Sequence, residues 1–94
     1  MKPRKAIEWF AQEMEAKLRE NDHKSGWQGC RFSELFPRLR EETDELLVTA
    51  HPLQLDTITK KLTHEDACEL IRECADIANF AMMLADNIRA KAER

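Results

Sequence analysis

Apolar residues in the first part of the chain recur at spacings of three and four, the period of an amphipathic α-helix. We predict a helix from about Arg4 to about Asn21, with Pro3 near its start, where a missing N–H costs little. Its buried face would comprise Ile7, Phe10, Met14 and Leu18. The following segment, residues 21–30, contains both glycines of the chain, so we expect a loop there.

A second helix is predicted to begin after Ser33, a favourable N-cap residue, although Pro37 lies close to its first turn. It should end near Ala50, because the residue before Pro52 disfavours helical backbone. Between residues 52 and 62 the apolar positions fit either a short helix or an irregular segment, and the pattern does not choose between them.

The remainder of the chain is predicted to form one long helix that follows Thr63 and runs to about residue 90. Thr63 and Asp66 resemble a capping box, and the basic Arg89 and Lys91 suit the other end of the helix dipole. The chain has only 2 glycines and 3 prolines and is rich in good helix formers. We therefore expect a single all-α domain over residues 1–94.

Carboxylates interrupt the apolar stripe of the second helix. The run RLREETDELL, residues 38–47, holds four acids within five positions. At about 100° per residue, Glu42 falls inside the stripe and Glu45 lies at its edge, whereas Asp44 points away and should be solvated. The apolar members of this stripe are Leu35, Leu39 and Leu46.

The long helix repeats this pattern. From Cys74 to Ala85 it is apolar on nearly every side, apart from Asp76 and Asn79. One stripe reads Glu73, Asp76, Phe80 and Met83. A helix that is apolar on several sides is buried from several directions, and a chain of 94 residues has few elements to cover it. We expect oligomerisation to complete the core, giving a homodimer or a homotetramer.

Unpaired carboxylates in a protein core cost several kcal/mol per ion, so these acids need compensation. Arginines are one source, and three lie nearby in the sequence: Arg38, Arg40 and Arg72. Mg²⁺ is another, because this hard cation prefers oxygen ligands. Acids three apart on two facing helices would form a four-carboxylate cup, as in metal sites of helical bundles. The residues alone leave a magnesium site and a structural ion-pair network equally open.

Charge and hydropathy exclude several classes of partner. The net charge of −3, with no basic stripe, argues against nucleic acid. No apolar run follows the basic N-terminus as in a secretory signal, and none approaches the ~20 residues of a membrane span. The three cysteines lack metal-type spacing and are expected to be reduced thiols. We expect a cytoplasmic protein that does not bind membranes.

Two acidic motifs resemble those of the MazG-like nucleoside triphosphate pyrophosphohydrolases. Residues 41–45 (EETDE) and 73–76 (ECAD) match the EExxE…ExxD pattern of that family. The 27 residues between them lie toward the long end of its range. The segments NDHKSGW at 21–27 and DIANFAMMLAD at 76–86 are also similar to small single-domain members. The resemblance covers most of the chain, with residues 52–62 unmatched.

The resemblance implies an all-α helical bundle that forms homodimers, often paired into homotetramers. It also implies Mg²⁺-dependent hydrolysis of nucleoside or deoxynucleoside triphosphates to monophosphate and pyrophosphate, a role in cleaning the nucleotide pool. Carried over by position, the magnesium ligands would be Glu42, Glu45, Glu73 and Asp76. The catalytic acids would be Glu41, Glu42 and Glu45, with Glu41 orienting or deprotonating the attacking water.

Four further residues are candidates for binding the substrate. In the glycine-bounded loop, His23 and Lys24 are either solvated or near phosphate, where Lys24 would make a charge-assisted contact. Trp27 either stacks on a base or covers the first helix. Asn79, one turn beyond Asp76, either binds a sugar or base or is a core amide.

Two other functions remain open at this stage. One is a related all-α pyrophosphatase that acts on another phosphorylated substrate, such as dUTP or phosphoribosyl-ATP. The other is a helical oligomerisation module without catalytic activity, whose buried acids pair with arginines.

Overall fold

The structure is a computed structural model that describes residues 1–93. It contains three α-helices: α1 (Lys5–Glu20), α2 (Phe32–Ala50) and α3 (His64–Ala92). A single 3₁₀ turn, η1 (His51–Leu53), follows α2, and there is no strand in this part of the chain. The predicted all-α class is confirmed.

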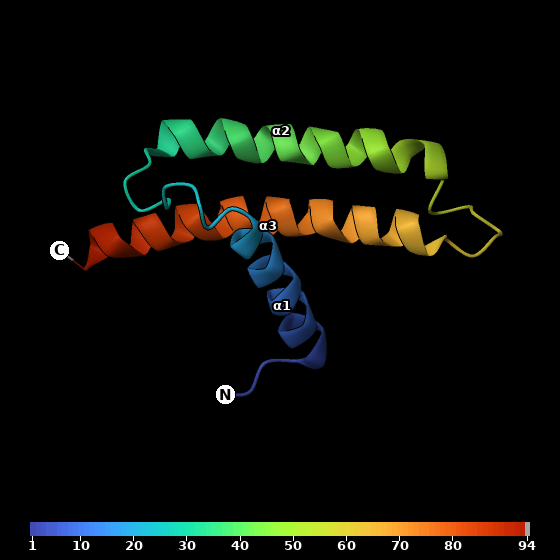
Figure 1. Cartoon of the computed structure of the whole chain (residues 1–94), viewed down its shortest axis with the longest axis horizontal. Coiled ribbons are helices and arrows are strands. Elements are labelled where there is room, and N and C mark those ends of the chain that lie inside the picture. Colours follow the sequence, from blue (N-terminus) through green and yellow to red (C-terminus); the bar gives the residue numbers. More distant parts are fainter. Residues whose placement is uncertain (94) are drawn as a thin grey trace.

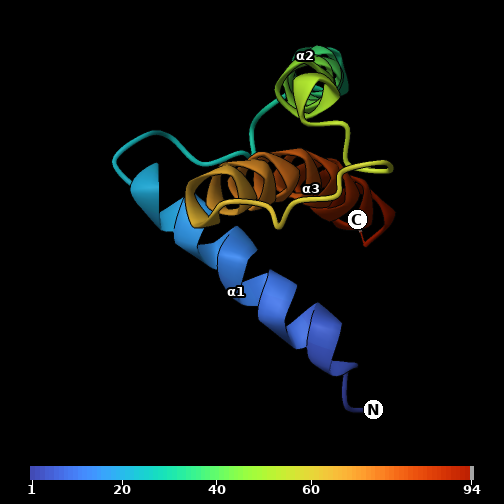
Figure 2. The ribbon, with the colours of Figure 1, turned by 90° about the vertical axis from the view of Figure 1, so that its right-hand side faces the viewer.

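Helix α3 lies between the other two helices. Helices α2 and α3 run antiparallel and side by side (Figure 1). Helix α1 crosses α3 on the side opposite α2 (Figure 2), and α1 and α2 pack against α3 rather than against each other. The buried apolar core is small and consists of Leu35, Leu70, Ala75 and Leu84.

Helix α1 has the predicted bounds to within one residue, but its buried face is shorter than predicted. Phe10, Met14 and Leu18 are partly buried, whereas the Ile7 side chain is 59% exposed. The reason is geometric, because the N-terminal half of α1 projects beyond α3 (Figure 2). The prediction that Ile7 belongs to the buried face of this chain is therefore wrong.

Helix α2 begins at Phe32, so the prediction of Ser33 as its N-cap is wrong. The N-cap is Arg31, whose backbone is extended and whose side chain makes no capping bond. Pro37 lies inside the helix, where one backbone hydrogen bond is missing because proline has no N–H to donate. The helix ends at Ala50 as predicted, because the chain tightens into η1 there.

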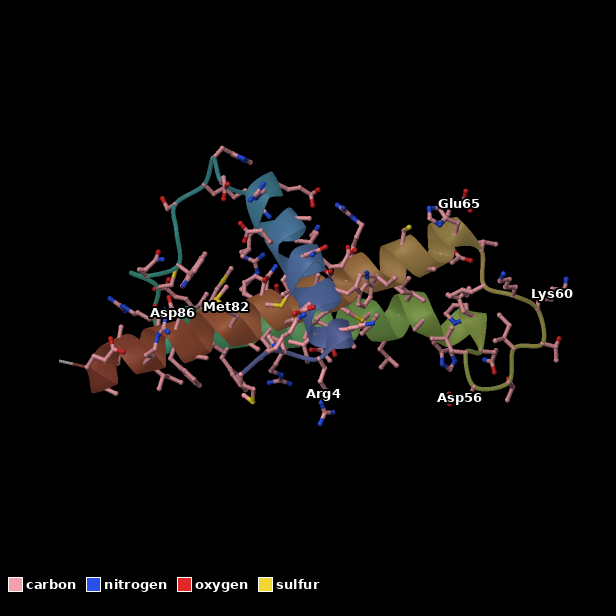
Figure 3. All side chains as sticks on the ribbon, turned by 90° about the horizontal axis from the view of Figure 1, so that it is seen from below. Arg4, Asp56, Lys60, Glu65, Met82 and Asp86 are labelled. Atoms are coloured by element: carbon pink, nitrogen blue, oxygen red, sulfur yellow. The ribbon has the colours of Figure 1, made fainter. Side chains whose placement is uncertain are left out.

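Beyond η1, the connection to α3 is irregular rather than a short helix. Gln54 adopts a left-handed backbone with φ of 51°, and its carbonyl accepts hydrogen bonds from the N–H groups of Thr57 and Ile58. This connection, which holds Asp56 and Lys60, lies at the far end of the molecule from the α1–α2 loop (Figure 3). Helix α3 then starts as predicted, with Thr63 Oγ1 accepting a bond of 3.1 Å from the N–H of Asp66.

The chain is extended for its length. Its radius of gyration is 15.4 Å, against about 12 Å for a compact domain of this size. Its accessible surface is 7727 Å², against about 5,600 Å² for a compact monomer of equal mass. None of the described helices has the length and apolar character needed to cross a bilayer.

Candidate functional site

A cavity of about 630 Å³ is lined by the C-terminal end of α1, the loop of residues 21–30, the first half of α2 and the middle of α3. Its cationic lining residues are Lys17, Lys24 and Arg38. Its carboxylates from the predicted cup are Glu42 and Asp76. Its aromatic residues are Trp27 and Phe80. The cavity thus combines groups that bind anions, groups that bind cations and flat apolar surfaces.

The other two predicted metal ligands border a neighbouring hollow. Glu45 and Glu73 line a cavity of about 340 Å³ between α2 and α3, together with Thr49. The structure therefore divides the four carboxylates between two hollows along α2 and α3 rather than gathering them in the single cup expected from the helical spacing, and Glu45 is exposed. No three His, Cys, Asp or Glu side chains within residues 1–93 converge closely enough to hold a metal ion in their present positions.

Glu42 lies in an unfavourable electrostatic environment. Burial raises its pKa, and the hydrogen bond and charge of Glu45 and the charge of Asp76 raise it further, to about 7. The positive charge of Arg38 opposes this shift without cancelling it. Glu42 therefore lacks a cation close enough to compensate its charge.

Glu73 and Asp76 on α3 have contrasting partners. Glu73 Oε1 accepts a hydrogen bond of 2.8 Å from Thr49 Oγ1, while Glu73 Oε2 is buried without a hydrogen-bond partner in the described chain. Asp76 Oδ1 lies 3.5 Å from Lys17 Nζ. Burial raises the pKa of Asp76, and Lys17 opposes that shift.

The oxygen-only chemistry of this donor set suits a hard divalent cation, although the structure does not gather the four carboxylates at one point. The set contains four carboxylates on two facing helices, one orphaned buried oxygen and one carboxyl whose pKa is raised by burial and then by its acidic neighbours. Oxygen-only ligands of this kind suit Mg²⁺. Glu45 and Glu73 would have to rotate toward Glu42 and Asp76 for all four to share one ion.

Glu41, the remaining predicted catalytic acid, is exposed and does not line the cavity. Its Oε2 lies 3.5 Å from Nε of Arg38. The Arg38 guanidinium in turn lies over the Phe80 ring, with 5.2 Å from Cζ to the ring centroid. The i, i+3 spacing of Arg38 and Glu41 on α2 accounts for the pairing.

Side chains of α3 hold the α1–α2 loop in place. The Trp27 indole N–H donates to Asp86 Oδ2 at 2.9 Å, and the Asn87 amide donates to the carbonyls of Trp27 and Cys30. The Trp27 bond, followed by that of Arg89, lowers the pKa of Asp86. Figure 3 shows Asp86 on α3 beside this loop.

The four substrate-binding candidates have different positions. Lys24 and Trp27 line the cavity, whereas His23 is exposed and outside its lining. Asn79 is 4% exposed and its amide donates to the Met14 carbonyl of α1 at 3.0 Å. The Asn79 Oδ1 atom, by contrast, is buried without a hydrogen-bond partner in the described chain, and Asn79 does not line the cavity, so its contact with a nucleotide stays a prediction.

Lys17, Asp86 and Asn87 were not among the sequence candidates, whereas Arg38 was expected as a possible partner of the acids and Phe80 as a member of the stripe on the long helix. One of the first three had a signal in the pattern. Lys17 lies three residues after Met14, so a lysine continues the apolar stripe of α1. The contacts of Asp86 and Asn87 with the loop span about sixty residues of sequence and have no local signature.

Comparisons of the chain with protein-family models, with curated proteins and with solved structures give no match.

Proposed function

We propose that this chain is a Mg²⁺-dependent pyrophosphohydrolase that converts nucleoside or deoxynucleoside triphosphates to monophosphate and pyrophosphate. The observation that carries the proposal is a set of carboxylates on α2 and α3 that lack arginine partners and adjoin a cavity whose lining includes three cationic side chains. The acidic motifs at residues 41–45 and 73–76 supply this set. Their resemblance to the MazG-like family supplies the reaction.

Ion pairing supports this proposal over the oligomerisation module. That alternative requires arginines beside the buried acids. Within residues 1–93, Arg38 pairs with Glu41 and Arg72 pairs with Glu20, both on exposed surfaces. Of the four predicted ligands, Asp76 has an ion-pair partner there, and that partner is a lysine. A metal ion supplies the missing positive charge directly.

The cavity has properties suited to a nucleotide. Its volume of about 630 Å³ falls within the usual range of small-molecule sites, roughly 300–1,000 Å³. Lys17, Lys24 and Arg38 are proposed to neutralise phosphate oxygens, and Trp27 and Phe80 offer aromatic faces to a base. The lining is compatible with any base, so dUTP-type and phosphoribosyl-ATP-type substrates remain alternatives to a broad specificity.

The proposed roles of the acidic residues follow from their positions. Glu42, Glu45, Glu73 and Asp76 would hold Mg²⁺. When bound, Mg²⁺ neutralises the charge of the polyphosphate and favours deprotonation of water. Glu41 is proposed to orient or deprotonate the attacking water, and its contact with Arg38 keeps its carboxylate beside one of the side chains that line the cavity.

Pyrophosphate release with ordinary and modified nucleotides, in the presence of Mg²⁺, tests this proposal. Glu42→Gln and Asp76→Asn should each lower turnover by about 100-fold or more, because a metal ligand is lost. Glu69→Gln is the matched control, since Glu69 is an exposed carboxylate on α3 one turn before Glu73. Near-normal release by either ligand variant, with circular dichroism unchanged, would overturn the assignment.

We also propose that a second copy of the chain completes the core. The chain exposes about 2,100 Å² more than a compact monomer of its mass, comparable to the area that each subunit buries in large obligate dimers. The projecting half of α1 is proposed as part of that interface, because Ile7 and Trp9 are 59% and 48% exposed there. A homotetramer would bury further exposed apolar residues near the C-terminal end of α2, namely Leu47 and Val48.

A further inference from the structure

Lys17 is held in an alternating row of charges that links α1 to α3. Its side chain is 17% exposed, and its ammonium lies 3.5 Å from Asp76 and 3.8 Å from Glu20. Arg72 on α3 binds the same Glu20 at 2.7 Å. Lys17 therefore contacts one carboxylate inside the proposed metal cup and a second carboxylate outside it.

The Lys17 ammonium, as placed beside Asp76, would oppose the binding of Mg²⁺ by the four proposed carboxylate ligands. A lysine ammonium and a divalent cation repel each other strongly when both adjoin one carboxylate in a partly buried site. Lys17 has another carboxylate within reach, since Arg72 fixes Glu20 beside it. It also lines the cavity in which a polyphosphate would lie.

We propose that Lys17 is a resident counter-cation of Asp76, displaced when Mg²⁺ enters and then free to bind the polyphosphate of the substrate. The inference rests on the proposed function and adds a regulated step to it. In the metal-free protein, Lys17 stabilises the partly buried carboxylate of Asp76. In the loaded site, the Lys17 ammonium leaves the Asp76 carboxylate and pairs with a phosphate oxygen of the substrate.

This exchange predicts opposite effects of one substitution on two ligands. Lys17→Met keeps the length of the side chain and removes the competing charge, so the nucleotide-free protein should bind Mg²⁺ more tightly, by up to about fivefold. The same variant should raise KM for the triphosphate and change kcat less, because a phosphate contact is lost. A lysine with a purely structural role would not improve metal binding when removed.

Isothermal titration of Mg²⁺ into the nucleotide-free protein is the decisive measurement, with steady-state kinetics alongside. Lys17→Arg keeps the charge and should bind Mg²⁺ as the wild type does. Lys24→Met is the matched control, because Lys24 lines the same cavity and forms no ion pair within residues 1–93. It should raise KM and leave Mg²⁺ affinity unchanged. Lys17→Gln replaces Lys17→Met should the latter fail to fold.

The outcomes separate this inference from the proposed function. Should the wild type bind no Mg²⁺, the proposed function fails and the role of Lys17 fails with it. Should the wild type bind Mg²⁺ and release pyrophosphate, while Lys17→Met binds Mg²⁺ equally or more weakly, the role of Lys17 alone is overturned. Tighter Mg²⁺ binding together with a raised KM supports it.

Discussion

Glu42 has the most informative electrostatic environment of the predicted ligands. Its pKa is raised from 4.5 to about 7, mainly by burial and then by its acidic neighbours. A carboxyl with a raised folded-state pKa favours folding while it is protonated. Its favourable contribution is fully present below pH 4.5 and is lost as the pH rises through about 7. In the metal-free protein, the ionised Glu42 is therefore destabilising.

At this scale we predict that metal-free wild type loses thermal stability as the pH rises from 4.5 through about 7. Glu42→Gln should remove that loss. At higher pH its free energy of unfolding should exceed that of the wild type by about 1 kcal/mol, or ~4–8 °C in Tm. Melting curves over this pH range, with Glu69→Gln as control, provide the check. A loss of about 3–5 kcal/mol in Glu42→Gln would instead indicate a buried cationic partner.

The contact between the 21–30 loop and α3 operates at the scale of elements. A loop between two helices gains a defined shape when side chains of a rigid neighbour satisfy its polar groups. Here the Asp86 carboxylate accepts from the Trp27 indole, and the Asn87 amide binds two loop carbonyls. Because its pKa is lowered, Asp86 contributes stability above pH 3.8 that is lost as the pH falls through its folded-state value.

We predict that Asp86→Ala changes Trp27 fluorescence and raises KM severalfold, with a smaller effect on kcat. The physical reason is that Trp27 borders the cavity and loses the acceptor that orients its ring. Asp86→Asn retains an acceptor oxygen and should give an intermediate effect. Arg89→Met removes the other partner of Asp86, leaves the indole bond and serves as control. An unchanged KM in Asp86→Ala would exclude Trp27 from substrate binding.

The whole molecule exposes too much apolar surface for a compact monomer. Only four apolar side chains are buried among the described residues, and the longest axis spans 52 Å. Two helices packed on a third leave α3 uncovered on part of its circumference, as Figure 2 shows. The missing cover is proposed to come from a second copy.

We predict a mass of at least twice 11.0 kDa by light scattering at micromolar concentration. Ile7→Glu should shift the protein toward the monomer and lower its Tm, because a charge would enter the proposed interface. Asp56→Lys, a change of charge in the exposed connection to α3, is the control and should leave the mass unchanged. A monomeric wild type would refute this prediction.

Local periodicity determined the helical elements. The period of apolar residues predicted α1 and α3 within about two residues, and the spacing of Thr63 and Asp66 predicted a cap that the structure confirms. The helical angle placed Glu42 within a stripe that is partly buried. These properties follow from interactions within one or two turns, which the order of residues specifies directly. The start of α2 was missed because Arg31 begins it without a capping side chain.

Tertiary packing alone decided the partners of the site. Lys17 meets Asp76, Trp27 meets Asp86 and Asn79 turns to Met14 across about sixty residues. These contacts depend on where α1 crosses α3. No local pattern encodes that crossing, because it results from the packing of whole helical faces. The same crossing exposes Ile7, whose apolar character was evident in the sequence although its lack of cover within the chain was not.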